Sequence, residues 1–270
     1  MSVLDVRLPE GHARPVVVEV PHAGTALPEE LRGELDVPPD ALLRDADLYV
    51  DELFAGAPAA GAILIAARYS RYVADLNRAA EDLDPALLSD DVCERRGPSR
   101  GVIWRSTTDG RVVFPRPPTA ESLRRRVERY YRPYHEEISR CLSAARERFG
   151  HVILVAAHSM PSTSGRGWDR RADVVPGTLG RSSASAQVIE LVDRHFREAG
   201  LSVRHDDPYR GGFATAHYGR PSLGQHAVQI ELNRALYMDE RSCRKKPGDF
   251  ERLRALLEGL VHKLGELSGG

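Results

Sequence analysis

Two histidines follow directly after apolar segments of the sequence, where a side chain could do chemistry. His22 comes after residues 15–20 and His158 after residues 152–157, and both segments are typical of buried strands. In open α/β sheets, ligands bind in a crevice at the carboxyl ends of the strands. Two imidazoles, one carboxylate and a water in the fourth position make a catalytic zinc site.

The carboxylate of such a site could come from Asp45 or Asp47, which lie in a segment with helical spacing of its apolar residues. Both aspartates also have an ordinary interpretation, because carboxylates in the first turns of a helix interact favourably with its dipole. A histidine after a strand is likewise often a structural residue held by hydrogen bonds. No H-E-x-x-H motif is present, so the spacing alone leaves both interpretations open.

Glu231 is the next candidate, because it lies in an apolar strand pattern over residues 226–232 that alternates with Ala227, Gln229 and Glu231 on one face. An unpaired charge in such a strand is costly. One interpretation is a salt bridge to an arginine such as Arg234. The other is a general base beside a metal-bound water.

Three polar residues after the strand predicted at residues 62–67 suggest recognition of an anion. Arg71 and Arg78 could bind a carboxylate through two hydrogen bonds, and Asn77 adds a neutral donor. An arginine can also stabilise an oxyanion that develops during a reaction. The alternative is that these are surface arginines, although the strand-like flanks fit that alternative less well.

Other catalytic chemistries lack their motifs. The sequence contains no G-x-S-x-G, no G-x-x-x-x-G-K-[ST] and no G-x-G-x-x-G after a strand. Its three cysteines, an odd number without a C-x-x-C, predict free thiols in a reducing cytosol. They are Cys93, Cys141 and Cys243.

The elements that must position these residues alternate between strands and helices, which predicts an α/β fold around a mostly parallel sheet flanked by helices, in one domain over residues 1–270. Residues 79–118 are predicted to form a long excursion over the site, and Pro133 should kink or divide the longest helix. The arginines at 124–126 are expected on a solvated helix face. Strands are expected at residues 15–20, 62–67, 101–104, 112–114, 152–157, 173–175, 201–205 and 226–232, and helices at residues 28–35, 40–57, 119–149, 182–199 and 249–267.

Composition points to a cytoplasmic protein that acts on a small molecule. Of the 270 residues, 38 are Lys or Arg and 39 are Asp or Glu, so no net field favours nucleic acid or an anionic membrane. Hydrophobic residues make up 41 %, enough for a sizeable core. We see no signal peptide at the N-terminus and no apolar segment long enough to span a bilayer.

Several blocks of the sequence, taken together and in order, resemble the N-formylglutamate amidohydrolase (deformylase) family of histidine degradation. They extend from about residue 17 to residue 240. The blocks are Val20-Pro21-His22-Ala23-Gly24, Asp45-Ala46-Asp47, Tyr69-Ser70-Arg71-Tyr72-Val73-Ala74-Asp75-Leu76-Asn77-Arg78, Ala157-His158-Ser159, His217-Tyr218-Gly219 and His226-Ala227-Val228-Gln229-Ile230-Glu231-Leu232.

The resemblance implies a phosphorylase/hydrolase-like fold related to zinc carboxypeptidases and aspartoacylase, with one zinc ion. By this resemblance Glu231 is the base and Arg71 binds the oxyanion. Of the two aspartates Asp47 is preferred, because its distance to Leu53 is similar to that in other members. The implied zinc ligands are His22, Asp47 and His158; the implied substrate contacts are Asn77 and Arg78, with Arg210, His217 and His226 as further contacts.

The implied reaction is hydrolysis of N-formyl-L-glutamate to formate and L-glutamate. Two features depart from the related enzymes. Thr25 occupies the position of the carboxypeptidase carboxylate ligand and cannot serve, and residues 93–118 differ from the formylglutamate enzymes. The alternatives are therefore a metallohydrolase for another N-acyl amino acid or for N-formimino-L-glutamate, and a non-catalytic protein that binds an acidic ligand.

Overall fold

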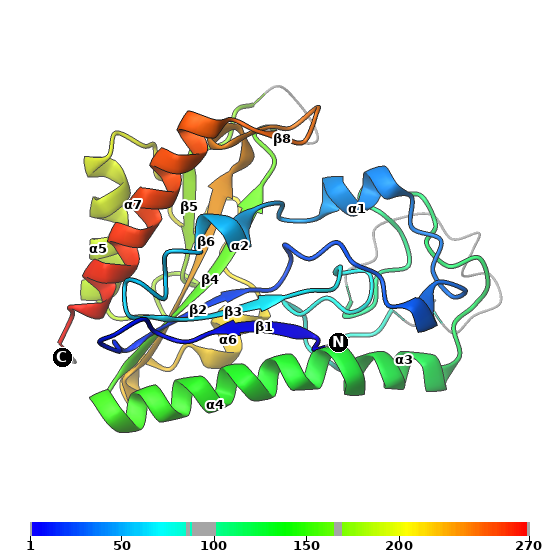
Figure 1. Cartoon of the computed structure of the whole chain (residues 1–270), viewed down its shortest axis with the longest axis horizontal. Coiled ribbons are helices and arrows are strands. Elements are labelled where there is room, and N and C mark those ends of the chain that lie inside the picture. Colours follow the sequence, from blue (N-terminus) through cyan, green and yellow to red (C-terminus); the bar gives the residue numbers. More distant parts are fainter. Residues whose placement is uncertain (1, 85–86, 88–100, 165–168, 269–270) are drawn as a thin grey trace. The chain divides into compact units, whose positions relative to one another are not determined.

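The computed structural model describes residues 2–84, 87, 101–164 and 169–268. Its elements are labelled in Figure 1. The strands are β1 (Leu4–Arg7), β2 (Val16–Val20), β3 (Ile63–Ala67), β4 (Val152–Met160), β5 (Val174–Gly177), β6 (Gln225–Asn233), β7 (Met238–Asp239) and β8 (Arg244–Lys245). The helices are η1 (Glu29–Leu31), α1 (Pro39–Asp45), α2 (Val50–Leu53), α3 (Ala120–Arg126), η3 (Val127–Tyr131), α4 (Arg132–Phe149), α5 (Ala186–Glu198), α6 (Phe213–Tyr218), η4 (Pro221–Leu223), η5 (Arg234–Leu236) and α7 (Pro247–Gly265).

The chain forms two compact units that alternate along the sequence. Unit 1 comprises Met1–Leu4, Pro21–Leu48 and Ala67–Glu137, and unit 2 comprises Asp5–Val20, Tyr49–Ala66 and Ile138–Gly270. The single domain predicted over residues 1–270 stays a prediction.

A six-stranded sheet in the order β1-β3-β2-β4-β6-β5 organises unit 2, with only Leu4 and Ala67 at its margin belonging to unit 1. β2 is parallel to both β3 and β4, β4 is parallel to β6, and β5 is antiparallel to β6. The predicted α/β class with a mostly parallel sheet is therefore confirmed.

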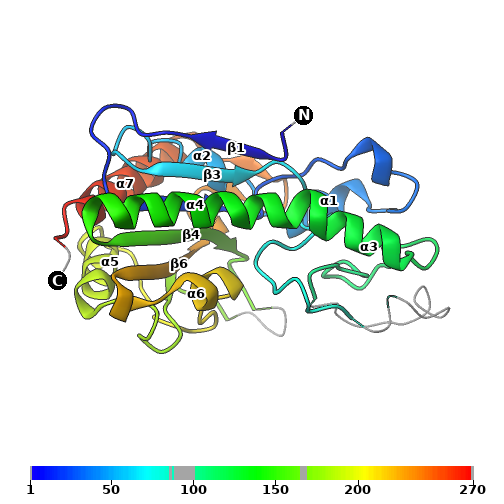
Figure 2. The same ribbon diagram turned by 90° about the horizontal axis from the view of Figure 1, so that it is seen from below.

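Helices cover the sheet of unit 2 on both faces. α6 contacts β4 and β6, whereas α7 contacts β2, α2 and α5. In Figure 2, α6 and the unit 2 part of α4 lie on one face, with α2, α5 and α7 on the other. Because both faces are covered, β2 and β4 are buried along their whole length, which explains why their residues are almost all apolar. β6 is buried on both faces too, although its alternating sequence predicted one polar face.

The helix predicted at residues 40–57 is wrong as a single element. α1 ends at Asp45, Ala46 is extended (φ −80°, ψ 153°), Tyr49 is left-handed (φ 68°), and α2 begins at Val50. The backbone amide of Asp47 donates to the carbonyl of His22 at 2.9 Å. This hydrogen bond to a segment distant in the sequence takes the place of the bond that the amide would make inside a continuous helix. The two aspartates therefore lie at and beyond the end of a helix, not in its first turns.

Other predicted elements are shorter than expected. Residues 201–205 contribute a single bridge, Val203 to Val174, and residues 101–114 a single bridge, Ser106 to Val112, so the strands predicted there are wrong. The helix predicted at residues 28–35 is reduced to η1. Cys141 is a buried free cysteine and Cys243 a partly exposed one, while Cys93 and part of the predicted excursion lie outside the described residues.

The long helix is confirmed, with Thr119 as its N-cap. Pro133 was predicted to kink or divide this helix, and the π-helical segment η3 interrupts it and ends two residues before Pro133. The solvated face predicted for the arginines at 124–126 is wrong for Arg126, which is fully buried. Its guanidinium pairs with Glu34 at 2.9 Å and lies 5.2 Å from the ring centre of Phe114, so both its charge and its apolar stem are accommodated inside unit 1.

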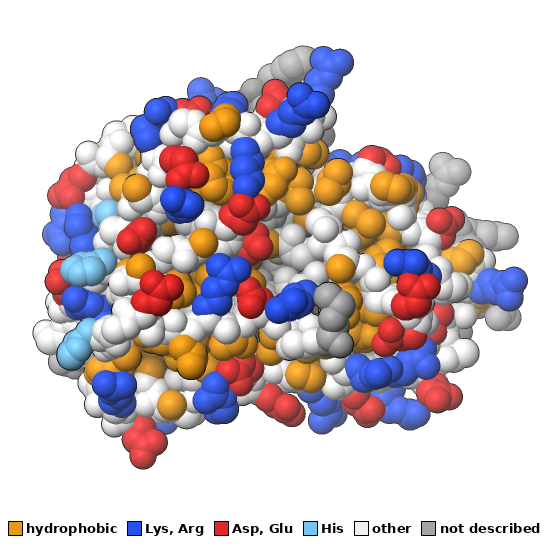
Figure 3. Space-filling model, in the orientation of Figure 1, with side chains coloured by type: hydrophobic (Ala, Val, Ile, Leu, Met, Phe, Trp, Pro, Cys, Tyr) orange, Lys and Arg blue, Asp and Glu red, His pale blue; other side chains and the backbone are white. Residues whose placement is uncertain are grey.

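Positive and negative side chains are interspersed over the face of the protein shown in Figure 3. This agrees with the near balance of charge in the sequence. A helix that could cross a membrane is not found among the described residues.

Candidate active site

His22 is held in unit 1 by a close approach of two backbone segments. The segment after β2 pairs with the segment after β3 through a bridge from Ala26 to Tyr69. Gly24 makes this approach possible, since a Cβ there would lie 2.5 Å from the carbonyl carbon of Arg68 and 2.7 Å from the carbonyl oxygen of Ala67. His22, which is 2 % exposed, is thereby brought to the segment that contains Arg71 and Asp75.

Gly24→Ala should therefore lower the free energy of unfolding by about 1–3 kcal/mol, because the added methyl group meets rigid backbone. Urea denaturation would measure this loss. Gly33→Ala in the same unit is the matched control, since a Cβ there meets nothing within 4 Å and should change stability little. Equal stabilities of the two variants would contradict this account of Gly24.

Asp47 faces the imidazole of His22. Its Oδ2 lies 3.6 Å from His22 Nδ1, and the Asp47 side chain is only 4 % exposed. A distance of 3.6 Å is too long for a hydrogen bond between these atoms. The pair therefore consists of two buried atoms of types that could hold a metal ion, 3.6 Å apart.

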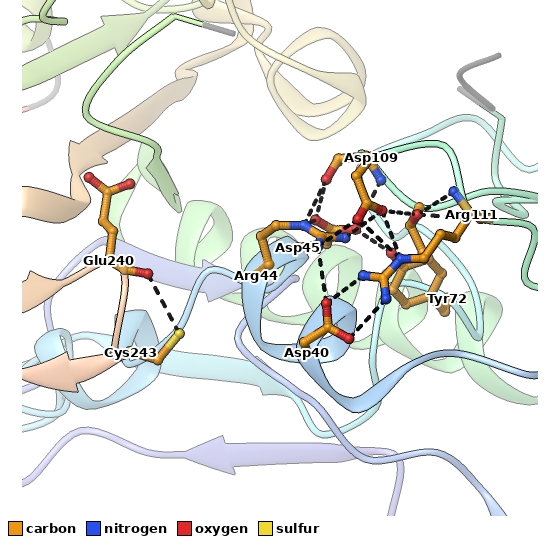
Figure 4. A network of polar contacts seen from close by, with 10 residues as sticks. Asp40, Arg44, Asp45, Tyr72, Asp109, Arg111, Glu240 and Cys243 are labelled. Atoms are coloured by element: carbon orange, nitrogen blue, oxygen red, sulfur yellow. Dashed lines mark hydrogen bonds and ion pairs between the residues drawn. The ribbon is translucent and has the colours of Figure 1, made fainter.

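Asp45 has a different environment, shown in Figure 4. Its carboxylate accepts hydrogen bonds from the Tyr72 hydroxyl, from Arg44 Nε at 3.1 Å, and from both the backbone amide (3.1 Å) and the hydroxyl of Thr108. Burial and the hydrogen bond to Asp45 raise the pKa of Tyr72. Four donors surround the Asp45 carboxylate, which identifies it as the centre of a structural network.

Asp75, for which no role was predicted from the sequence, lies in the interior of unit 1. It is fully buried and accepts hydrogen bonds from His22 Nε2 (2.8 Å), Arg71 Nη2 (2.7 Å) and Trp104 Nε1 (2.8 Å). Burial opposes its ionisation, but Arg71 and His22 hold the pKa of this carboxyl well below its usual range. The signal available in the sequence was an aspartate inside an arginine-rich, otherwise apolar segment.

Arg71 lies between Asp75 and an aromatic ring. Its guanidinium carbon is 4.2 Å from the ring centre of Trp104. Burial alone would lower the pKa of Arg71, but the carboxylates of Asp75 and Asp47 raise it. Arg71 Nε is buried and has no hydrogen-bond partner within the described part of the chain. Arg71 is thus a cation held in a fixed position, and its Nε–H group can donate a further hydrogen bond.

Asn77 and Arg78 follow on the same segment. The amide of Asn77 donates to Asp75 Oδ1 at 3.0 Å, and the amide of Arg78 donates to the Asp75 carbonyl at 3.3 Å. Tyr131 donates its hydroxyl hydrogen to the Arg78 carbonyl at 2.8 Å. The backbone of the predicted carboxylate-binding pair is therefore anchored, while both side chains remain partly exposed.

In unit 2, His158 and Glu231 lie directly opposite each other on the parallel strands β4 and β6. Residues paired in this way project from the same face of the sheet on strands about 4.8 Å apart. The two residues are 3 % and 6 % exposed. The structure thus brings the predicted histidine ligand and the predicted base side by side.

The orientation of Glu231 depends on Gln229, two residues earlier on the same face. Gln229 Nε2 donates to Glu231 Oε1 at 2.9 Å, and Gln229 Oε1 accepts from the amide of Gly212 at 2.8 Å. The segment Arg210–Gly212 is itself held by a bond from the Leu179 amide to the Arg210 carbonyl at 2.7 Å. Arg210 therefore belongs to a segment that supports the Glu231 carboxylate.

Two of the predicted substrate contacts lie elsewhere in unit 2. His217 is exposed on α6, with its ring stacked on that of Phe213. His226 pairs with Ile153 at the beginning of β6, five residues before Glu231, which corresponds to about 16 Å along the strand and to the opposite face. Its Nδ1 accepts from the amide of Ser185, and burial lowers its pKa. The structure does not bring His226 to Glu231.

Comparison with known proteins gives a consistent result. Residues 14–238 match the model of the N-formylglutamate amidohydrolase family. The chain is 34 % identical to an N-formylglutamate deformylase of Pseudomonas putida over 230 residues (84 % of this chain, 82 % of the relative) and 32 % identical to one of Pseudomonas aeruginosa over 255 residues (93 % and 92 %). The crystal structure of N-formylglutamate amidohydrolase from Ralstonia eutropha JMP134 matches with a TM-score of 0.88 and 34 % identity, covering 98 % of both chains.

Proposed function

The chain belongs to the N-formylglutamate amidohydrolase family, and from this premise we propose that it is a zinc-dependent enzyme that hydrolyses N-formyl-L-glutamate to formate and L-glutamate. The observation that carries the proposal is the buried pair of His22 Nδ1 and Asp47 Oδ2 in a chain of this family. An imidazole nitrogen and a carboxylate oxygen held 3.6 Å apart in the interior are the kind of pair that a shared metal ion brings together.

The residues present fit a zinc ion. His22, Asp47 and His158 each offer one ligand atom, and all three are buried. Two atoms bound tetrahedrally to one zinc ion at about 2.1 Å lie about 3.4 Å apart, close to the 3.6 Å between His22 Nδ1 and Asp47 Oδ2. β2, which ends two residues before His22, runs beside β4, which carries His158. Asp45 is set aside because its carboxylate is already bonded to four donors.

The mechanism that we propose assigns a separate role to each residue. A zinc ion held by His22, Asp47 and His158 would supply a water of lowered pKa and polarise the formyl carbonyl. Glu231 takes the proton from the attacking water and delivers it to the amine nitrogen as the C–N bond breaks. Arg71 donates hydrogen bonds to the formyl oxygen as negative charge develops on it. Asn77 and Arg78 bind a substrate carboxylate and so orient the amide.

The test is the metal content and the products of the purified protein. We expect about one zinc ion per chain and release of formate and L-glutamate in equal amounts from N-formyl-L-glutamate. N-formimino-L-glutamate, N-acetyl-L-glutamate and N-formyl-L-aspartate form the comparison panel. Faster turnover of a panel member would replace the proposed substrate, and a folded protein without metal or turnover would contradict the proposal altogether.

Arg78→Ala should chiefly raise the KM for N-formyl-L-glutamate, by about 10–100-fold, because a charge-assisted hydrogen bond contributes roughly 1.5–3 kcal/mol. Steady-state kinetics on this substrate and on N-formyl-L-glutamine would separate a side-chain contact from a general loss. Arg129→Ala is the control, since Arg129 is an exposed arginine of the same unit that pairs with Glu30. Equal losses on both substrates would argue against a contact between Arg78 and the side-chain carboxylate.

A further inference from the structure

We propose that Asp75 is a positioning residue whose one carboxylate fixes the imidazole of His22, the guanidinium of Arg71 and the backbone of Asn77 together. The inference rests on the proposed function, in which His22 binds the metal, Arg71 binds the oxyanion and Asn77 binds the substrate. Asp75 would act through these residues, without contact to the substrate.

The hydrogen bonds of Asp75 use its whole acceptor capacity. Oδ1 accepts from His22 Nε2 at 2.8 Å and from the Asn77 amide at 3.0 Å. Oδ2 accepts from Arg71 Nη2 at 2.7 Å and from Trp104 Nε1 at 2.8 Å. An ionised carboxylate offers about four lone-pair positions, two on each oxygen. All four are taken by donors, so Asp75 has no capacity left to be a metal ligand itself.

The bond to Asp75 determines which nitrogen of His22 can bind a metal. A carboxylate with four donors is ionised and cannot donate, so the hydrogen of the shared bond must be on His22 Nε2. The lone pair that a metal needs is then on Nδ1, the atom that faces Asp47 at 3.6 Å. A carboxylate that accepts from the distal nitrogen of a histidine ligand fixes its tautomer and its ring orientation and raises its basicity.

The same carboxylate links this histidine to the arginine. Arg71 is held on one side by Asp75 and on another by the ring of Trp104, whose indole N–H donates to the same oxygen of Asp75. A guanidinium fixed by an ion pair and an aromatic face needs little reorganisation when charge develops near it. A displacement of Asp75 would therefore disturb the histidine and the arginine together.

Asp75→Asn tests the proposal, because an amide has one acceptor oxygen and turns an N–H₂ group toward two of the four donors. Competition with a chromophoric chelator would measure the Zn²⁺ affinity of the metal-free proteins. We expect the affinity to fall about 10–100-fold. Asp45→Asn is the matched control, since Asp45 is another buried carboxylate of unit 1 with four donors, none of which is His22. It should lose stability but bind Zn²⁺ as the unchanged protein does.

A second measurement needs no variant of Asp75. In the zinc-loaded protein, nitrogen NMR of the histidine rings, with His22→Gln to assign the signals, should show the hydrogen of His22 on Nε2 and the metal on Nδ1. A hydrogen on Nδ1 would overturn the proposal. Zn²⁺ binding by a folded Asp75→Asn protein within twofold of the unchanged protein, or an equal loss in Asp45→Asn, would do the same.

These outcomes separate the role of Asp75 from the function itself. If the unchanged protein binds Zn²⁺ and turns over N-formyl-L-glutamate while Asp75→Asn keeps its Zn²⁺ affinity, the role of Asp75 is wrong and the function stands. If the unchanged protein binds no Zn²⁺, the zinc-dependent function and the role of Asp75 are both wrong.

Discussion

Glu231→Gln should lower kcat by about 10²–10⁴-fold while the metal stays bound, because the amide keeps the size of the side chain but cannot accept a proton. Glu231 is buried on β6 opposite His158, and Gln229 holds one of its oxygens at 2.9 Å. Its other oxygen is the atom that we expect to take the proton from water. Steady-state kinetics together with elemental analysis of the same preparation would measure both quantities.

Glu240→Gln is a suitable control for this variant. Glu240 is a carboxylate of the same unit that accepts a hydrogen bond from the Ser162 amide at 3.1 Å. The side-chain oxygen of a glutamine can accept the same hydrogen bond. Its kcat should stay near that of the unchanged protein. A Glu231→Gln protein that retains kcat within a few-fold would remove Glu231 as the base. Loss of the metal along with activity would give Glu231 a structural role instead.

His158→Ala should remove the metal and with it the hydrolase activity. The loss should exceed the roughly 10–100-fold loss of metal affinity or activity that follows when a residue hydrogen-bonded to a metal ligand is replaced. His158 is 3 % exposed near the carboxyl end of β4, so its removal also leaves a hole that water can enter. Elemental analysis and thermal unfolding with and without added Zn²⁺ would follow the binding. The unchanged protein should be stabilised by Zn²⁺, because a ligand that binds only the folded state shifts unfolding upward.

His195→Ala serves as the control for a lost buried histidine. His195 Nε2 bonds to the carbonyl of Leu256 at 2.9 Å, and burial lowers its pKa. This variant should unfold at a lower temperature but keep its metal and its response to Zn²⁺. If His158→Ala bound zinc as well as His195→Ala does, His158 would not be a ligand.

The central strands of the sheet could be predicted from the sequence because both of their faces are buried, whereas β1 (Leu4–Arg7), which is only partly buried, was not among the expected strands. β2 and β4 are nearly continuous apolar segments, and such segments are distinctive without any knowledge of their neighbours. His22 and His158 could be found for the same reason, since each follows directly from such a segment. Arg71, Asn77 and Arg78 were predicted to bind an anion from their residue types, and their separate roles came from the resemblance to a family. The structure anchors the backbone of the latter two.

The break in the helix predicted at residues 40–57 could not be predicted, because apolar spacing continues through it. The helix ends where the Asp47 amide bonds to the His22 carbonyl, a contact between residues far apart in the sequence. The role of Asp75 could not be predicted for a similar reason. Its four donors come from His22, Arg71, Asn77 and Trp104, and only the fold brings them to one carboxylate.

The sequence by itself determined the α/β class, the buried strands and the residue types that could bind a metal, because these depend on local hydrophobicity and on side-chain chemistry. Residue type and spacing left Asp45 and Asp47 equivalent, two residues apart in one polar segment, and only the resemblance to a family favoured Asp47. The tertiary structure gives the physical difference between them. Tyr72 and Thr108 reach the carboxylate of Asp45, whereas His22 faces that of Asp47. A carboxylate's role is set by the donors that surround it, and those donors come from distant parts of the chain.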